Sequence, residues 1–319
     1  MTNIVYNHDA AIDEYMAGLL LDNMPGLTLR AIVLTNGDCL GQQAMEAAWK
    51  MAQYTGRQEV PLSLSESRIY QAFPYSYRSD CIRQRDIPCL RRYAPAPAPP
   101  YPSGNEALAG LLRQAIADGE PLTLVCTCSL TTLYDVLSAE PELEQGLEHL
   151  LWMGGAIAVR GNLDATTIPP EIANGTAEWN VFSDPAAADW VLNHPGRSYK
   201  VTVCPLDLTD QAKITQAFKD ALNAQASESR LSLLASQSYA LVAAEPFYEL
   251  WNVSSVCFLP RPDLYSAPET MRLGIVRDGF DQGTMRPTQD PGSQPVDVVL
   301  NLIDPDGFYA YVLELFRSY

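Results

Sequence analysis

The sequence is poor in basic residues, and this shortage excludes several classes of partner. It has 21 Lys and Arg against 38 Asp and Glu in 319 residues, which gives a formal net charge of −17 at pH 7. A surface with this excess of negative charge repels a phosphate backbone and an anionic lipid headgroup alike. We therefore expect neither nucleic acid binding nor association with a membrane.

Long apolar runs and a basic leader are also missing. No apolar stretch reaches the roughly 20 residues that span a bilayer, and residues 1–9 contain no basic segment of the kind that opens a signal peptide. The seven cysteines are scattered, without the two-residue-spaced pair of a zinc knuckle. We expect reduced, mostly buried thiols in a cytoplasmic protein.

Strand-like and helix-like segments alternate along the chain. Together with a hydrophobic content of 47%, this alternation predicts one large α/β domain over residues 1–319. The domain is expected to be doubly wound, with a mostly parallel sheet, helices on both faces and the active site at the carboxyl ends of the strands. We expect strands at 3–6, 29–34, 122–126 and 199–204, a further apolar run at 147–153, and helices at 12–21, 41–54, 105–118, 186–192, 211–225 and 231–245, the last ended by Pro246.

Residues 94–104 read Ala-Pro-Ala-Pro-Ala-Pro-Pro-Tyr-Pro-Ser-Gly. A segment this rich in proline is stiff and extended, and it forms no hydrophobic core of its own. We interpret it as a surface connector within the domain. A docking motif for a proline-recognition domain is the alternative.

The turn after the first strand carries three carboxylates within six residues. Asp9, Asp13 and Glu14 lie at the end of a strand, where they repel one another unless a cation or a positive helix end compensates them. A hard divalent cation bound by oxygen atoms suits this group, although the spacing is not that of an EF-hand. The alternative is that Asp13 and Glu14 interact with the helix dipole and that Asp9 is a cap.

Polar and glycine-rich motifs follow the later strands, where ligands of such a sheet bind. Asparagine and glutamate side chains around a glycine-rich loop are suitable partners for hydroxyl groups. A tryptophan close to them can serve the core or a ligand. The motifs are Asp9-x3-Asp13-Glu14, Thr35-Asn-Gly-Asp-Cys39, Met153-Gly-Gly-Ala156, Val159-Arg-Gly-Asn162, Gly175-Thr-Ala-Glu-Trp-Asn180 and Tyr248-x2-Trp251-Asn252.

The order of these motifs resembles the nucleoside hydrolases, in particular the branch that prefers inosine, adenosine and guanosine. The most specific stretch runs from Met153 through Pro185, where the motif at 175–180 is followed by Asp-Pro. The resemblance extends from Asn3 to about Phe316 and is weakest over 59–120. It implies hydrolysis of the N-glycosidic bond of purine ribonucleosides to free base and ribose.

Members of this family hold one Ca²⁺ at the bottom of the pocket, and the ion also binds the attacking water and two ribose hydroxyls. The positions that match its ligands are Asp9, Glu14, the backbone carbonyl of Thr127 and Asn252. Asp9 also matches the carboxylate that takes the proton from the water. Since Ca²⁺ acidifies water only weakly, such a base is still needed.

The ribose of the substrate is held in the family by a set of carboxylates and amides. The matching positions are Asp13, Asn162, Glu178 and Asn180. Carboxylate and amide oxygens around the sugar stabilise the positive charge of a transition state that resembles an oxocarbenium ion.

Two aromatic rings enclose the base in the purine-preferring branch. Trp251 matches one ring, and Tyr77 matches the other, where relatives carry Trp; a phenol ring still stacks. Asp38 matches an aspartate near the base, and Tyr248 matches a residue of a mobile lid helix.

Several positions depart from the family pattern. Asn7 and Ser76 stand where relatives have Asp and Glu, and Glu14 and Asn252 each replace an Asp ligand. Fewer carboxylates lower the affinity for Ca²⁺. A nucleoside- or ribose-binding protein without turnover, or a hydrolase with another nucleoside preference, are therefore the alternatives, while the intact Asp9 favours the enzyme. The resemblance further implies a cytoplasmic homodimer that acts in nucleoside salvage.

Overall fold

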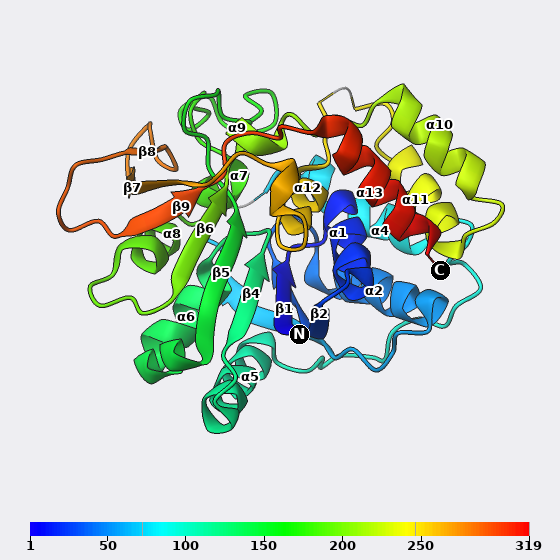
Figure 1. Ribbon diagram of the computed structural model, residues 1–319, viewed down its shortest axis with the longest axis horizontal. Coiled ribbons are helices and arrows are strands. Elements are labelled where there is room, and N and C mark those ends of the chain that lie inside the picture. The colour runs from blue at the N-terminus through cyan, green and yellow to red at the C-terminus, as the bar shows by residue number, and fades with distance from the viewer. Residues whose placement is uncertain (72, 246, 319) are drawn as a thin grey trace.

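In the computed structural model, which describes residues 1–71, 73–245 and 247–318, nine strands form one sheet (Figure 1). The order is β3-β2-β1-β4-β5-β6-β9-β7-β8, and all neighbours from β3 to β9 pair in parallel. The strands are β1 (Thr2–His8), β2 (Leu27–Asn36), β3 (Leu62–Arg68), β4 (Leu122–Cys126), β5 (Leu147–Met153), β6 (Lys200–Cys204), β7 (Glu269–Ile275), β8 (Met285–Pro287) and β9 (Pro295–Val298).

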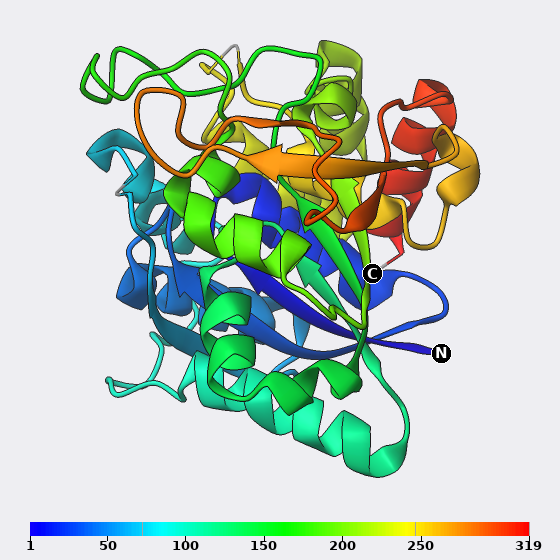
Figure 2. The same ribbon diagram turned by 90° about the vertical axis from the view of Figure 1, so that its left-hand side faces the viewer.

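The last three strands close one edge of the sheet. β7 pairs antiparallel with both β8 and β9, so the parallel order ends there. Figure 2 views the molecule from this edge. The structure thus has the mostly parallel sheet that the sequence predicts, with an antiparallel edge that it does not.

Helices cover both faces of the sheet. The longer ones are α1 (Ile12–Asn23), α2 (Gly41–Thr55), α5 (Gly104–Asp118), α6 (Thr131–Ala139), α8 (Pro185–Asn193), α10 (Gln216–Gln225), α11 (Arg230–Ala240) and α13 (Pro305–Arg317). The shorter ones are α3 (Tyr75–Arg78), α4 (Asp80–Arg85), η1 (Pro141–Gly146), α7 (Trp179–Ser183), α9 (Leu206–Thr209), α12 (Trp251–Cys257) and η2 (Pro262–Leu264).

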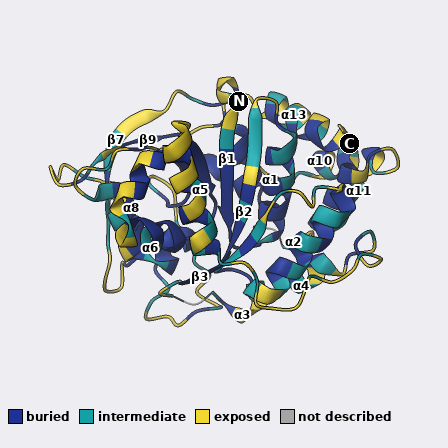
Figure 3. Ribbon diagram, turned by 90° about the horizontal axis from the view of Figure 1, so that it is seen from below, coloured by how far each residue is buried: buried dark blue, intermediate teal, exposed yellow. Residues whose placement is uncertain are grey.

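Alternate residues of the central strands point into two separate hydrophobic cores. Ile4 and Tyr6 of β1 join the core formed with α1, α2, α11, α12 and α13. Val5 between them joins the core formed with α5, α6 and α8. Figure 3 shows β1 as a largely buried strand with α5 to one side and α1 to the other. This two-sided burial confirms the doubly wound class and explains why these strands read as continuous apolar runs.

Two helices differ from their predicted limits. The helix predicted over 211–225 begins at Gln216, because the Thr215 hydroxyl accepts a hydrogen bond from the Phe218 amide (3.1 Å) and caps the helix there. The helix predicted over 231–245 is α11, which ends at Ala240. The predicted helix end at Pro246 lies outside the described residues.

The proline-rich connector contains no helix or strand over residues 94–102. It is tied to the domain at its far end, where the Leu64 amide of β3 donates to the Pro102 carbonyl (3.0 Å) and Ser103 caps α5. In the part of the chain that the structure describes, no helix is both long enough and apolar enough to cross a membrane.

Candidate active site

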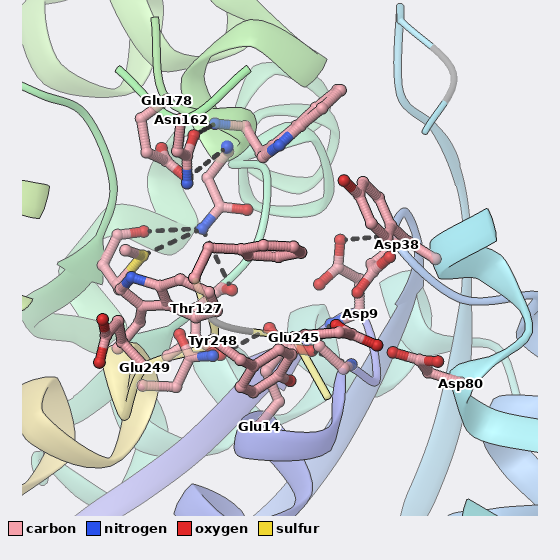
Figure 4. A pocket seen from close by; sticks show the side chains of 18 of the residues that line it. Asp9, Glu14, Asp38, Asp80, Thr127, Asn162, Glu178, Glu245, Tyr248 and Glu249 are labelled. Atoms are coloured by element: carbon pink, nitrogen blue, oxygen red, sulfur yellow. Dashed lines mark hydrogen bonds between the residues drawn. The ribbon is translucent and has the colours of Figure 1, made fainter. Parts of the chain in front are cut away.

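The carboxyl ends of β2, β1, β4 and β5 border one cavity of about 540 Å³ (Figure 4). The structure brings together at this cavity all but one of the side chains that the sequence singled out. The exception, Asp13, does not line it. The predicted residues that do are Asp9, Glu14, Asp38, Tyr77, Thr127, Asn162, Glu178, Asn180, Tyr248, Trp251 and Asn252.

The Asp9 carboxylate is fixed by the neighbouring strand end. Its Oδ2 accepts a hydrogen bond from the Asp38 backbone amide at 2.7 Å. A Cβ at Gly37 would lie 2.2 Å from that oxygen, so only glycine leaves room for it. Ala10 follows with φ of 77°, a conformation that costs a non-glycine residue about 1–2 kcal/mol. The turn therefore holds Asp9 in one position at some cost in backbone strain.

The Glu14 side chain folds back over the start of its own helix. Its Oε2 accepts hydrogen bonds from the backbone amides of Ala11 (2.7 Å) and Asp9 (3.1 Å). Its Oε1 accepts a hydrogen bond from the Thr127 hydroxyl at 3.1 Å. The extra methylene of glutamate thus lets the carboxylate cap α1 and still reach the end of β4.

Negative charge is crowded and poorly compensated at these strand ends. Burial raises the pKa of Glu14 to about 8, and burial together with the Glu14 charge raises the pKa of Asp9 well above its ordinary value. His8 lies 3.6 Å from Glu14 Oε2, but burial lowers the pKa of His8 to about 3 and keeps it neutral. A bound cation would relieve this repulsion.

Asp13 lies beneath the cavity and anchors α12. Its Oδ2 accepts hydrogen bonds from the Asn252 (2.7 Å) and Val253 (3.0 Å) amides, and its Oδ1 accepts one from the Tyr239 hydroxyl (2.8 Å). Burial raises the pKa of Asp13 to about 7, although these donors oppose the shift. Its carboxylate compensates the unpaired amides at the helix start.

The oxygen atoms at this end of the cavity suit a hard divalent cation. Asp9 and Glu14 supply carboxylates, and Thr127 supplies a backbone carbonyl. The side-chain oxygen Oδ1 of Asn252 is buried and has no hydrogen-bond partner among the described residues, as expected of an oxygen that binds an ion. Among the described residues no group of three or more His, Cys, Asp or Glu side chains could hold a metal, so any such site depends on the two neutral oxygens.

Glu178 organises the opposite wall of the cavity. Its carboxylate caps α7 by accepting hydrogen bonds from the amides of Asn180 (2.8 Å) and Val181 (3.3 Å), and it also accepts one from Gly155 (2.8 Å). Burial raises its pKa to about 7. Its neighbour Asn162 accepts a hydrogen bond from the Trp179 amide (3.1 Å). The glycine-rich loop and the start of α7 are thereby joined through one carboxylate.

Two further polar side chains hold this wall in place. The Asn180 amide nitrogen donates to the carbonyls of Met153 (3.1 Å) and Thr127 (3.3 Å), which ties α7 to the ends of β5 and β4. Asp207, which the sequence did not single out, accepts hydrogen bonds from the backbone amides of Ile157 and Ala158 at 2.8 and 2.7 Å.

A continuous group of aromatic rings forms another side of the cavity. Trp179 stacks on Phe73 with ring centroids 4.8 Å apart, and Tyr77 meets the Trp179 ring edge-on at 6.3 Å. Phe247 packs edge-on against Tyr77 at 6.5 Å. The sequence singled out only Tyr77 of these rings for the base. Trp179 lies within the 175–180 motif, and this was the one feature of the sequence that could have indicated its place in the cavity.

The second aromatic position lies at the start of α12. Trp251 donates a hydrogen bond through Nε1 to Asp210 (3.1 Å), and its ring lies 5.0 Å from that of Tyr248. The Tyr248 hydroxyl accepts a hydrogen bond from the Asp13 amide (3.2 Å). Tyr248 matches a residue of a lid helix in the family, but here it lies before the start of α12 and outside any helix.

Comparison with known proteins identifies relatives over nearly the whole chain. The family model described as inosine-uridine preferring nucleoside hydrolase matches residues 4–310. The pyrimidine-specific ribonucleoside hydrolase RihA of Shewanella woodyi is 28% identical, with 99% of this chain and 98% of that protein aligned. The non-specific ribonucleoside hydrolase RihC of Escherichia coli (strain SMS-3-5 / SECEC) is 28% identical over 61% of this chain and 60% of its own length.

Solved structures agree in fold. The inosine-uridine preferring nucleoside hydrolase from Bacillus anthracis superposes with a TM-score of 0.87 at 27% identity, and the match covers all of both chains. A purine-preferring ribonucleoside hydrolase from Gardnerella vaginalis superposes with a TM-score of 0.77 at 18% identity, again over both whole chains. At that identity the second likeness concerns the fold alone. The doubly wound architecture predicted from the sequence is confirmed.

Proposed function

Since the chain belongs to the inosine-uridine preferring nucleoside hydrolase family, we propose that it hydrolyses the N-glycosidic bond of purine ribonucleosides to free base and ribose. The observation that carries this proposal is the Asp9 carboxylate, held by the Asp38 amide at the edge of a cavity whose opposite wall is built on Glu178. A base on one side of the sugar and a carboxylate on the other fit hydrolysis through a cationic sugar.

Asp9 acts as the general base. With Oδ2 held by the Asp38 amide, the carboxylate is oriented to take a proton from a water molecule that attacks C1′ of the ribose. Asp9, Glu14, the Thr127 carbonyl and Asn252 would hold Ca²⁺. When bound, the ion supplies positive charge that keeps these carboxylates ionised and orients the water and the ribose hydroxyls.

Asn162, Glu178 and Asn180 hold the ribose. As the C1′–N bond breaks, positive charge develops on the sugar, and the Glu178 carboxylate stabilises that charge. Its three backbone donors fix it in place before the substrate arrives. Asp13, which we expected at the sugar, acts in this proposal through the position of Asn252, because its own oxygens are occupied beneath the cavity.

The aromatic rings enclose the base. The adjoining rings of Phe73, Tyr77 and Trp179 on one side, with Trp251 on another, offer faces broad enough for a bicyclic purine. A pyrimidine is the second candidate base, favoured by the names of the RihA relatives. Asp38, whose amide donates to Asp9, would contact the base.

The decisive experiment measures free ribose as reducing sugar after incubation with inosine or uridine in excess Ca²⁺. We expect release of ribose from the wild type and a loss of about 10²-fold or more in Asp9→Ala. The circular dichroism spectrum of the variant should be unchanged. No release from either nucleoside would contradict the proposal. Calorimetric binding of nucleoside without release would favour a binding protein on the same fold.

We further propose, on the family resemblance alone, a homodimer that acts in nucleoside salvage in the cytoplasm. Light scattering on the purified protein tests the first part, with a mass of about twice 35.1 kDa expected. A mass equal to one chain would contradict it.

A further inference from the structure

Carboxylates greatly outnumber cations around the cavity. Nine of the described residues that line it are Asp or Glu, and one, Lys213, is basic. Lys213 is already paired with Glu249 at 2.7 Å. Once Asp9 and Glu14 are assigned to Ca²⁺ and Glu249 to Lys213, six carboxylates still line a space meant for one nucleoside. A neutral ribose and a neutral base do not account for this charge.

Four of these carboxylates gather beside the aromatic rings that enclose the base. Burial is the main cause that raises the pKa of Asp38, Glu245 and Tyr77. The nearby Asp80 charge adds to the shift of Asp38 and Glu245, and the Asp164 and Glu245 charges add to that of Tyr77. Figure 4 shows Asp38, Asp80 and Glu245 on one side of the cavity, away from Glu178. The charge therefore lies at the base rather than only at the sugar.

Arginine relieves part of this charge but not all of it. Arg83 lies 3.0 Å from Asp80 and 3.7 Å from Glu245, and it does not line the cavity. Asp38 makes no ion pair with any described residue, although the Arg78 charge is near enough to oppose the rise of its pKa. It is 9% exposed, and its Oδ1 is buried without a hydrogen-bond partner although the residue lines the cavity. An unpaired buried carboxylate oxygen is costly unless the ligand supplies the missing charge or donor.

Aromatic faces next to carboxylates form the kind of site that binds organic cations. Phe73, Tyr77 and Trp179 all line the cavity. The face of an aromatic ring is negative, so it attracts a delocalised positive charge as well as stacking on it. Asp164 adds a negative charge at the edge of these rings, because its carboxylate accepts a hydrogen bond from the Tyr77 hydroxyl (3.3 Å) and hydrogen bonds lower its pKa. Asp38 lines the same cavity, and a cationic ligand beside it would favour its ionised form. A flat, positively charged ring satisfies both features together.

We propose that the cavity prefers ribonucleosides whose base is positively charged at the pH of the assay, such as N-methylated purines and pyrimidines in their protonated forms, over their neutral parents. This inference rests on the proposed hydrolase function and names its substrate class. Water forms the new C1′–O bond and gives its proton to Asp9, while the C1′–N electron pair passes to the ring nitrogen and neutralises the cationic base. Such a base leaves uncharged and needs no proton, whereas a neutral base would leave as an anion among carboxylates.

The test compares matched substrate pairs that differ by one methyl group and one positive charge. These are 7-methylguanosine against guanosine and 3-methylcytidine against cytidine. For each pair, the ratio of kcat/KM (charged over neutral) is measured in the wild type, in Asp38→Asn and in Asp220→Asn. Asp220 is an exposed carboxylate on α10, so its variant loses the same charge far from the cavity. The greater intrinsic lability of the charged nucleosides cancels when one protein's ratio is divided by another's.

We expect the ratio to fall about tenfold in Asp38→Asn and to stay within about twofold in Asp220→Asn, as for one charge removed near a ligand in a partly buried site. An equal loss for both members of a pair would place Asp38 on the sugar and overturn the inference. Turnover of inosine or uridine without turnover of any charged nucleoside would also overturn it, and the proposed function would stand. No turnover of any nucleoside would instead remove the proposed function.

Discussion

Replacing Gly37 with alanine should displace the Asp9 carboxylate and leave the fold intact. A Cβ at this position would lie 2.2 Å from Asp9 Oδ2 and 2.9 Å from its Cβ, and neither distance leaves room for a methyl group. The carboxylate must therefore rotate away, and it loses the 2.7 Å hydrogen bond from the Asp38 amide. A hydrogen bond to a charged group contributes about 1.5–3 kcal/mol to stability.

The effect on catalysis should exceed the effect on stability. A general base contributes about 10²–10⁴-fold to a rate, and a displaced one loses most of that factor. We expect kcat/KM for inosine or uridine to fall about 10²-fold or more in Gly37→Ala. The thermal unfolding midpoint should fall by less than about 10 °C. Ribose release and differential scanning calorimetry measure the two effects separately.

Gly110→Ala is the matched control. Gly110 lies in α5, where an added Cβ meets nothing within 4 Å. This variant should keep wild-type activity and gain up to about 1 kcal/mol of stability, because alanine restricts the unfolded chain. Wild-type kcat/KM in Gly37→Ala would refute the reasoning, since it would mean that Asp9 either is not held by this turn or is not the base.

Two further predictions concern the ion and the pH. Asn252→Asp should tighten Ca²⁺ binding about tenfold by calorimetry, because a carboxylate replaces an amide. Asn301→Asp, on the surface, is the control and should leave the Ca²⁺ affinity unchanged. Equal Ca²⁺ affinities of the wild type and Asn252→Asp would exclude Asn252 as a ligand. Burial raises the pKa of Glu178 to about 7, so the folded metal-free protein binds its proton more tightly than the unfolded chain. The stability that Glu178 contributes should therefore be fully present below about pH 4.5 and be lost towards pH 7, by about 3 kcal/mol, and the raised pKa values of Asp13 and Glu14 act in the same direction. An unfolding free energy that rises over this range would contradict the assignment.

The sequence predicted the sheet and the residues at its edge for physical reasons. Buried parallel strands need continuous apolar runs, and the polar residues that follow such runs must meet at one edge of the sheet. That argument placed Asp9, Asp38 and Thr127 at the cavity correctly. The order of the motifs also indicated Glu178, which lines the same cavity.

The direction of individual side chains could not be predicted in the same way. Asp13 and Glu14 are consecutive residues of a helix, so they project about 100° apart and cannot both face the cavity. Glu14 faces the strand ends, and Asp13 faces α12. Which of the two did so depended on the position of α12, more than 230 residues further along the chain.

The aromatic wall was largely missed for a related reason. Phe73 and Trp179 stack only because the chain returns to the same edge of the sheet. Local periodicity gives no sign of a contact between residues so far apart. The edge strands were missed because β8 and β9 are short, spanning Met285–Pro287 and Pro295–Val298, and because β7 is only partly buried and so has no continuous apolar run.

Because Asp13 anchors the start of α12, the positions of Trp251 and Asn252 depend on the same hydrogen bonds. Trp251, which contacts the base in our proposal, and Asn252, a candidate ion ligand, are the first two residues of one short helix, and both follow wherever the Asp13 carboxylate holds its amino end. Any tilt of α12 moves the Trp251 ring and the Asn252 side-chain oxygen together. In our proposal, a nucleobase that tilts α12 would also move a metal ligand, so the binding of metal and of nucleobase would be thermodynamically coupled through this helix.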